Sequence, residues 1–148
     1  MNIKGNTSPL AFHKKLGKIM WDNAGMARNE EGLKKGLKLV TELEEEFYKD
    51  LKITGTTDSM NQSLEKALRL AASFEISRLM LRDAMNRKES CGAHFREEYQ
   101  TKEGEAMRND DEFMYVASWE YNGHREDPTL HKEVLKFDTV KPTQRSYK

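Results

Sequence analysis

Residues 87–99 contain the amino acids of this chain that are best suited to chemistry. Their sequence is RKESCGAHFREEY, and it holds the only cysteine, Cys91, three residues before His94. A thiol beside an imidazole is the pair that cysteine nucleophiles use, because the histidine can remove the thiol proton. Cysteine and histidine also bind zinc, although a structural zinc site takes four ligands.

The spacing disfavours both kinds of chemistry. Three residues apart at a helix end, Cys91 and His94 are expected to point in different directions, and the other three histidines are scattered along the chain. We therefore predict a sharp turn after a long helix, which Gly92 permits. In such a turn the polar side chains satisfy exposed backbone groups or bond to a neighbouring surface: Arg87, Glu89, Ser90, His94 and Arg96.

Two other stretches with suggestive composition are interpreted as solvated helix faces. EGLKKGLK (31–38) has two glycines and a basic pair, but no strand precedes it and the phosphate-loop pattern is absent. ELEEEF (42–47) is a carboxylate cluster, yet catalytic carboxylates need an apolar pocket that separates their pKa values. The residues alone name no reaction.

Composition limits the classes of protein that fit. The 148 residues suit one domain, and 25 basic against 25 acidic residues give a formal net charge of zero. That balance argues against nucleic acid as a partner, since phosphate binding needs clustered cations. No apolar run is long enough to insert into a membrane, and MNIKGNTSPL is not a signal peptide. A single cysteine fits a reducing, cytoplasmic location.

Three amphipathic helices are expected in the first two-thirds of the chain. Ser8 and Pro9 predict the start of the first helix, and Gly25 predicts its end. The second helix opens at Asn29 and has apolar residues on one face. That stripe consists of Leu33, Leu37, Val40, Leu43, Phe47 and Leu51.

The third predicted helix is the longest, from about Asn61 to Lys88. It follows a loop rich in Gly, Thr and Asp, and Ser59 with Gln62 resembles a capping box. A helix that is apolar on two sides is normally the central member of a bundle. Its first face holds Ala67, Leu70, Ala71, Phe74, Leu81, Ala84 and Met85, and its second holds Leu64, Leu68, Ala72, Ile76, Leu79 and Met80.

The last third of the chain differs in its residue pattern and no longer has helical spacing. FMYVASWEY (113–121) and LHKEVLKFD (130–138) predict a hairpin or two extended arms, and an Asn-Gly turn signal lies between them. The predicted fold class is mainly α, an antiparallel three-helix bundle followed by an extended C-terminal tail with a short β-hairpin or two strands. Within one domain we expect a lead-in or linker (1–7), the bundle (8–90), and a loop with its tail on the bundle (91–148).

Four stretches taken together carry a resemblance to a known family. They are MWDNAGMARNEEGLKKGL (20–37), MNQSLEKAL (60–68), RKESCGAHFREEYQTKEGEAMRNDDEFMYVASWEY (87–121) and QRSYK (144–148). Over about residues 8–148 the chain resembles the C-terminal region of the succinate dehydrogenase and fumarate reductase flavoprotein subunit. That family also includes L-aspartate oxidase. Its most specific feature here is an ESxGAH core followed by an acidic DD segment.

The resemblance implies a domain without an active site of its own. In the family an N-terminal domain binds FAD, and the FAD and capping domains grip the substrate carboxylates; none of those motifs is present. We expect no catalytic, cofactor-binding or metal-binding residue in this fragment, with FAD bound only by the parent subunit. The implied partners are the FAD and capping domains of that subunit and the iron–sulfur subunit. The parent complex would lie at the cytoplasmic face of the inner membrane.

Residues 87–96 are then interpreted as a docking and turn element that fixes the bundle against the flavin domain. The candidates for these inter-domain contacts are Arg87, Glu89, Ser90, Gly92, His94 and Arg96. Many relatives have arginine where this chain has Cys91, and a thiol cannot replace the guanidinium's fork of donors. Two alternatives stay open: an independent helical binding module and an enzyme that uses Cys91.

Overall fold

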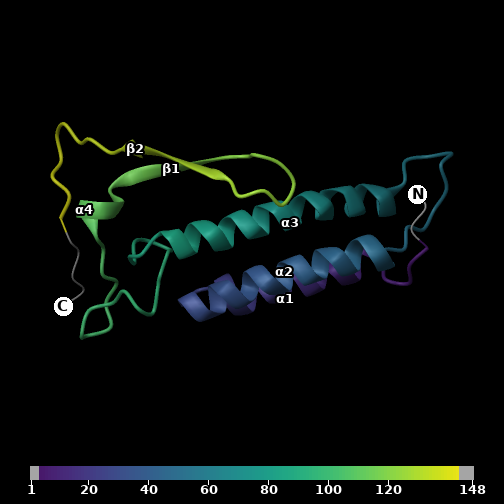
Figure 1. Ribbon diagram of the computed structural model, residues 1–148, viewed down its shortest axis with the longest axis horizontal. Coiled ribbons are helices and arrows are strands. Elements are labelled where there is room, and N and C mark those ends of the chain that lie inside the picture. Colours follow the sequence, from purple (N-terminus) through teal and green to yellow (C-terminus); the bar gives the residue numbers. More distant parts are fainter. Residues whose placement is uncertain (1–3, 144–148) are drawn as a thin grey trace.

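The computed structural model describes residues 4–143 and shows three long helices followed by a β-hairpin (Figure 1). The bundle consists of α1 (Pro9–Ala24), α2 (Glu30–Asp50) and α3 (Gln62–Asn86). A single-turn helix, α4 (Asp110–Phe113), precedes the antiparallel strands β1 (Tyr115–Glu120) and β2 (Thr129–Val134). The predicted fold class is confirmed, while the segment QRSYK lies outside the described residues.

Side-chain caps set the helix starts. The Ser8 hydroxyl accepts a hydrogen bond from the Ala11 amide at 3.3 Å, and the Asn29 side chain accepts one from the Gly32 amide at 2.8 Å. Both starts were predicted. The prediction of a capping box at Ser59 was wrong. Helix α3 is instead capped by Asn61, whose side chain accepts a hydrogen bond from the Leu64 amide at 3.0 Å. Asparagine is as strong a cap as serine, and it stands directly before the first helical residue.

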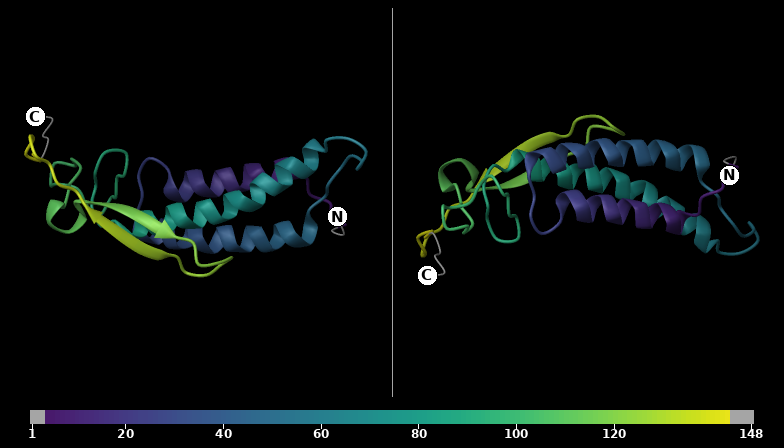
Figure 2. Two further views of the ribbon diagram at one scale, coloured as in Figure 1. Left: turned by 90° about the horizontal axis from the view of Figure 1, so that it is seen from above. Right: turned by 90° about the horizontal axis from the view of Figure 1, so that it is seen from below.

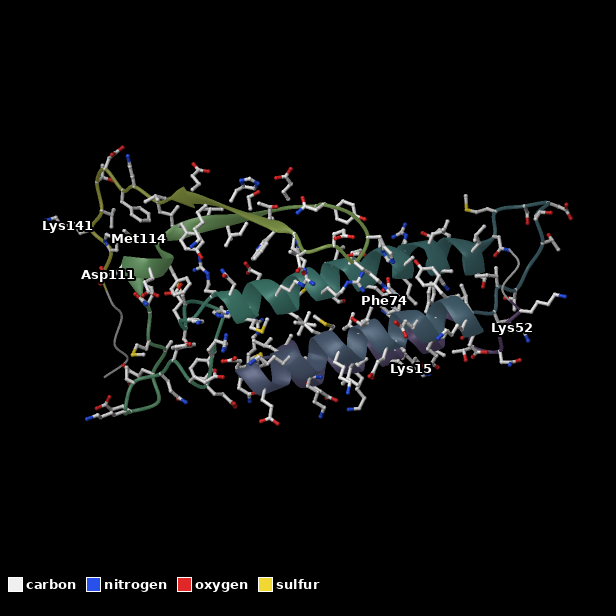
Figure 3. All side chains as sticks on the ribbon, viewed as in Figure 1. Lys15, Lys52, Phe74, Asp111, Met114 and Lys141 are labelled. Carbon is white, nitrogen blue, oxygen red and sulfur yellow. The ribbon has the colours of Figure 1, made fainter. Side chains whose placement is uncertain are left out.

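Three phenylalanines, one from each helix, form the centre of the core. The rings of Phe12 and Phe47 lie 5.4 Å apart, and those of Phe47 and Phe74 also lie 5.4 Å apart. Phe74 occupies the space between α3 and the other two helices (Figure 3). The stripe predicted for α2 faces this core, with Leu33, Val40, Leu43, Phe47 and Leu51 buried and Leu37 packed against them.

The two predicted faces of α3 differ in their surroundings. The first face supplies the buried residues Ala67, Leu70, Phe74, Leu81 and Ala84. On the second face Leu68, Ile76 and Met80 remain exposed, although apolar residues there had suggested burial on both sides. The hairpin lies along α3 opposite α1 and α2 and crosses obliquely towards α2 (Figures 1 and 2), so it covers this face only in part.

Close helix contact explains one of the two glycines of EGLKKGLK. Gly36 is buried, and a Cβ placed there would lie 2.8 Å from Leu81 Cδ2 and 3.0 Å from Asn23 Cβ. The interpretation of this stretch as a wholly solvated face was therefore wrong at Gly36. Its lysines are exposed, as expected.

The hairpin presents alternate side chains to α3. Tyr115, Ala117 and Trp119 of β1 are buried or half-buried, whereas the residues between them are exposed. The strands are joined by residues 121–128, so the Asn-Gly pair does not form a two-residue turn. Within this loop Gly123 and Arg125 have positive φ angles of 138° and 63°. No helix among residues 4–143 is both long and apolar enough to cross a bilayer.

Candidate functional site

Residues 87–97 form a junction at the C-terminal end of α3. The Arg28 amide, from the α1–α2 loop, donates to the Phe95 carbonyl at 3.0 Å, and the Glu97 amide donates to the Arg28 carbonyl at 2.8 Å. The Ser90 amide donates to the Met107 carbonyl at 2.9 Å. Three stretches that are distant in sequence are therefore joined here by backbone hydrogen bonds.

The predicted turn at Gly92 is present. The Cys91 amide donates to the His94 carbonyl at 2.8 Å, and the His94 amide donates to the Cys91 carbonyl at 3.1 Å. Gly92 has a φ of 59°, and a Cβ placed there would meet nothing within 4 Å. The left-handed backbone, rather than crowding, is thus what favours glycine at this position.

The His94 ring is fully engaged inside the junction. Its Nδ1 lies 3.1 Å from an Arg28 guanidinium nitrogen, and its Nε2 lies 3.0 Å from the Arg87 carbonyl oxygen. A guanidinium can only donate, so Nδ1 accepts and the proton is on Nε2. No ring nitrogen is left to activate the exposed Cys91 thiol, and the arrangement gives no support to a cysteine nucleophile.

This arrangement makes stability depend on pH. Burial, together with the charges of Arg28, Arg96 and Arg87, lowers the pKa of His94 below its usual value of about 6.5, against the opposing effect of the Arg87 carbonyl. The unfolded chain then binds more protons at mildly acidic pH. The contribution of His94 to stability is complete above about pH 6.5 and is lost as the pH falls towards the folded-state pKa.

We expect His94→Gln to weaken this pH dependence. Glutamine retains one donor and one acceptor but does not titrate. Urea unfolding between pH 5 and 8 should show a smaller acid-side loss of stability in the variant than in the wild type. The same loss in both proteins would contradict the assignment of neutral His94.

Arg96 is almost completely buried, with 1% of its surface exposed. Its Nη1 donates to the Ala84 carbonyl at 2.8 Å and lies 3.4 Å from the Met85 carbonyl, which are among the last carbonyls of α3. Its Nε lies 3.1 Å from the Glu98 carboxylate. Arg96 therefore caps the end of α3, where helix carbonyls have no partner in the helix itself.

The remaining candidates complete the same network. Arg87 bonds to the Glu89 carboxylate at 2.7 Å and to the Tyr115 carbonyl at 3.0 Å. The other Glu89 oxygen accepts from the Asn109 amide at 2.8 Å, and the buried Ser90 hydroxyl pairs with the Arg96 backbone. The structure thus brings all six candidates into one junction. Their contact with another domain stays a prediction.

A second polar cluster was missed by the sequence interpretation. Glu44 of α2 is completely buried, so the reading of ELEEEF as a solvated face was wrong at this residue. Its carboxylate lies 2.8 Å from Arg78 of α3 and 2.9 Å from Arg125 at the hairpin tip. A signal was present, because position 44 is four residues after Val40 and three before Phe47, on the apolar face.

Glu44, Glu75 and His124 place three potential metal-ligating atoms within 4.8 Å of one another. Their charge is already balanced, since Arg78 also bonds to Glu75 at 2.5 Å. Burial alone would raise the pKa of Glu75, but Arg78, His124 and the Arg125 amide outweigh it and lower that pKa. The cluster is best understood as an ionic link between the hairpin tip and helices α2 and α3.

Further polar contacts attach the hairpin around a small cavity. The Trp119 indole donates to Asp83 at 2.8 Å, and Arg82 pairs with Asp127 at 2.6 Å. Between α3 and the hairpin lies a cavity of about 200 Å³, whose walls include Ile76 and Trp119. Long side chains rather than close backbone contact hold this hairpin in place.

Comparison with known proteins decides the family. The model of the fumarate reductase flavoprotein C-terminal region matches residues 13–147. The chain belongs to this family. It is 35% identical over 103 residues to an uncharacterised FAD-dependent oxidoreductase of Methanocaldococcus jannaschii, covering 69% of this chain and 18% of that protein.

Relatives with assigned names agree with this family. The succinate dehydrogenase flavoprotein subunit of Bacillus subtilis is 28% identical over 147 residues, which is 99% of this chain and 24% of that subunit. A solved structure of the Escherichia coli quinol fumarate reductase FrdA superposes with a TM-score of 0.80 at 26% identity, covering 97% of this chain and 24% of FrdA. The chain thus spans about a quarter or less of the length of these relatives.

Proposed function

We propose that this chain serves as the C-terminal structural and assembly domain of an FAD-dependent succinate–fumarate oxidoreductase flavoprotein subunit. The family match over residues 13–147 carries the proposal. In this role the domain holds no active site of its own. It stabilises the flavoprotein through surfaces that contact the FAD and capping domains.

The polar groups of the junction support this role. Both ring nitrogens of His94 are bonded, and the guanidinium of Arg96 is occupied by α3 carbonyls and Glu98. Side chains that act on a substrate need donor or acceptor atoms that are not already bonded and that are directed into a cleft. Those of the junction are used to fix a loop instead, which suits a structural element.

The described residues do not fit FAD. Dinucleotide sites place the pyrophosphate at a glycine-rich turn between a strand and a following helix. Here β1 is followed by the antiparallel strand β2, and each of the bundle helices α2 and α3 is preceded by a helix rather than a strand. We therefore assign FAD to the remainder of the flavoprotein. The proposed role also makes the iron–sulfur subunit a partner of the flavoprotein. It places the complex at the cytoplasmic face of the inner membrane.

A chimeric flavoprotein tests the proposal. In it, this chain replaces the matching quarter of the Bacillus subtilis succinate dehydrogenase flavoprotein subunit. We expect the chimera to retain FAD, measured by flavin absorbance per polypeptide, and the subunit truncated before that quarter to lose it. In the chimera, replacing both His94 and Arg96 with alanine should lower flavin occupancy and thermal stability.

Two results would count against the proposal. Purified chain with its own bound yellow flavin would show that a cofactor site exists within these 148 residues. A chimera whose flavin content matches that of the truncated subunit would show that the chain cannot serve as this domain.

A further inference from the structure

Strand β1 has one edge that β2 does not cover. The Leu135 amide donates to the Met114 carbonyl at 3.1 Å, so Met114 and Leu135 are a hydrogen-bonded pair of the ladder. This pair determines which residues of β1 direct their backbone groups towards β2. Backbone groups alternate in an antiparallel pair, so those of Val116 and Ser118 face β2 and those of Ala117 and Trp119 face outward. The bond from Arg87 to the Tyr115 carbonyl confirms this alternation, because it reaches that outward edge.

Most of the outward edge is unoccupied. Arg87 covers the carbonyl of Tyr115, but no hydrogen bond to the outward N–H or C=O groups of Ala117 and Trp119 is formed within residues 4–143. Unpaired groups along a strand edge are a template for another strand. An extended peptide can therefore pair here with its own backbone.

The floor beside this edge is mainly apolar, and its charged residues, Asp83 and Arg87, already bond to Trp119 and Glu89. A groove of about 400 Å³ lies between β1 and α3. Ile76 and Met80 line it and are 58% and 52% exposed, and Leu79 lies between them on the helix. In strand addition the main chain supplies affinity and the side-chain pockets select alternate residues. This groove fits a strand whose inward residues are aliphatic.

We propose that an extended strand from the flavin-carrying part of the flavoprotein adds to the free edge of β1 and lies over Ile76 and Met80 of α3. This inference rests on the proposed function and specifies the contact. Relatives are about four times as long as the segment matched here, so most of their chain lies outside it. Covalent linkage gives such a strand a high effective concentration. It therefore favours pairing along an edge as short as residues 117–119, which would be weak between separate molecules.

Amide hydrogen exchange tests the contact directly. In the 148-residue chain, Ala117 and Trp119 should exchange quickly while Val116 and Ser118, bonded to β2, exchange slowly. In the chimeric flavoprotein described above, Ala117 and Trp119 should slow by about tenfold or more, as expected for newly bonded amides. A flavin-loaded chimera in which both still exchange quickly would overturn the strand contact and leave the proposed function intact. If Ala117 and Trp119 exchange slowly in the chain alone, and their protection increases with protein concentration, the edge pairs with a second copy. That result would overturn this choice of partner.

A proline at the edge gives a second readout. Ala117→Pro removes an outward N–H without removing a bond to β2. Ala117→Ser keeps that N–H and serves as the matched control. We expect only the proline chimera to lose FAD faster on dilution, with both isolated variants retaining the wild-type far-ultraviolet spectrum. Equal FAD loss from the two chimeras would overturn the proposal, and a chimera that never binds FAD would remove the proposed function together with this inference.

Discussion

Replacing Glu44 with alanine should destabilise the chain more than any other single charge removal described above. Glu44 is completely buried, and its partner Arg78 is 8% exposed. Without Glu44, Arg78 keeps only the partly exposed Glu75 as a partner at 2.5 Å. Breaking a buried ion pair by removing one member typically costs about 3–5 kcal/mol. We expect a loss of that size in the free energy of unfolding, measured by urea denaturation.

Two further variants separate the causes of this loss. Glu42 lies two residues earlier on the same helix, exposed and paired with Lys38 at 3.8 Å, so Glu42→Ala should change stability by less than about 0.5 kcal/mol. Joint replacement of Glu44 and Arg78 by methionine removes both charges and should restore much of the lost stability. A Glu44→Ala protein as stable as Glu42→Ala would refute burial of this charge.

Replacing Arg96 with alanine should have the second-largest effect. The change leaves the Ala84 carbonyl without its side-chain donor, removes the ion-pair partner of Glu98 and opens a cavity at the end of α3. Buried groups left without partners cost about 1–3 kcal/mol, and the lost side-chain volume adds to this. We expect a total loss of about 2–4 kcal/mol in urea unfolding.

A lysine at position 96 is the informative comparison. Lysine keeps the charge but lacks the guanidinium fork that reaches an α3 carbonyl and a carboxylate at once. Arg96→Lys should therefore fall between the wild type and the alanine variant. Arg69→Ala, which removes an exposed arginine from α3, should leave stability nearly unchanged. Similar losses in the Arg69 and Arg96 variants would indicate that Arg96 is not a cap.

Local signals predicted the bundle well because they act over one or two helical turns. Ser8, Asn29 and Gly25 stand at helix ends for reasons that a few neighbouring residues decide. Glu44 was misread because its partners, Arg78 and Arg125, lie 34 and 81 residues away. Periodicity placed Glu44 on the apolar face, but nothing local named the charges that would meet it there.

The junction shows the same limit. The sequence predicted the turn at Gly92, and it left open whether the polar side chains from Arg87 to Arg96 bond to exposed backbone groups or to a neighbouring surface. It did not predict that Arg28, from the α1–α2 loop, supplies the hydrogen bond that sets the His94 tautomer. Which surface is left for a neighbouring domain depends on such distant contacts, so it had to come from the fold.

The link from Arg125 to Glu44 also has a consequence for the order of folding. Closing a loop of 81 residues carries a larger entropic cost than joining adjacent helices, and contacts of long sequence separation form slowly. The bundle must exist before its second and third helices can present Glu44 and Glu75 together. A two-stranded ribbon is marginal alone, so the hairpin becomes stable only after the helices have assembled. During synthesis, the hairpin thus gains its structure from the three bundle helices that precede it in the chain.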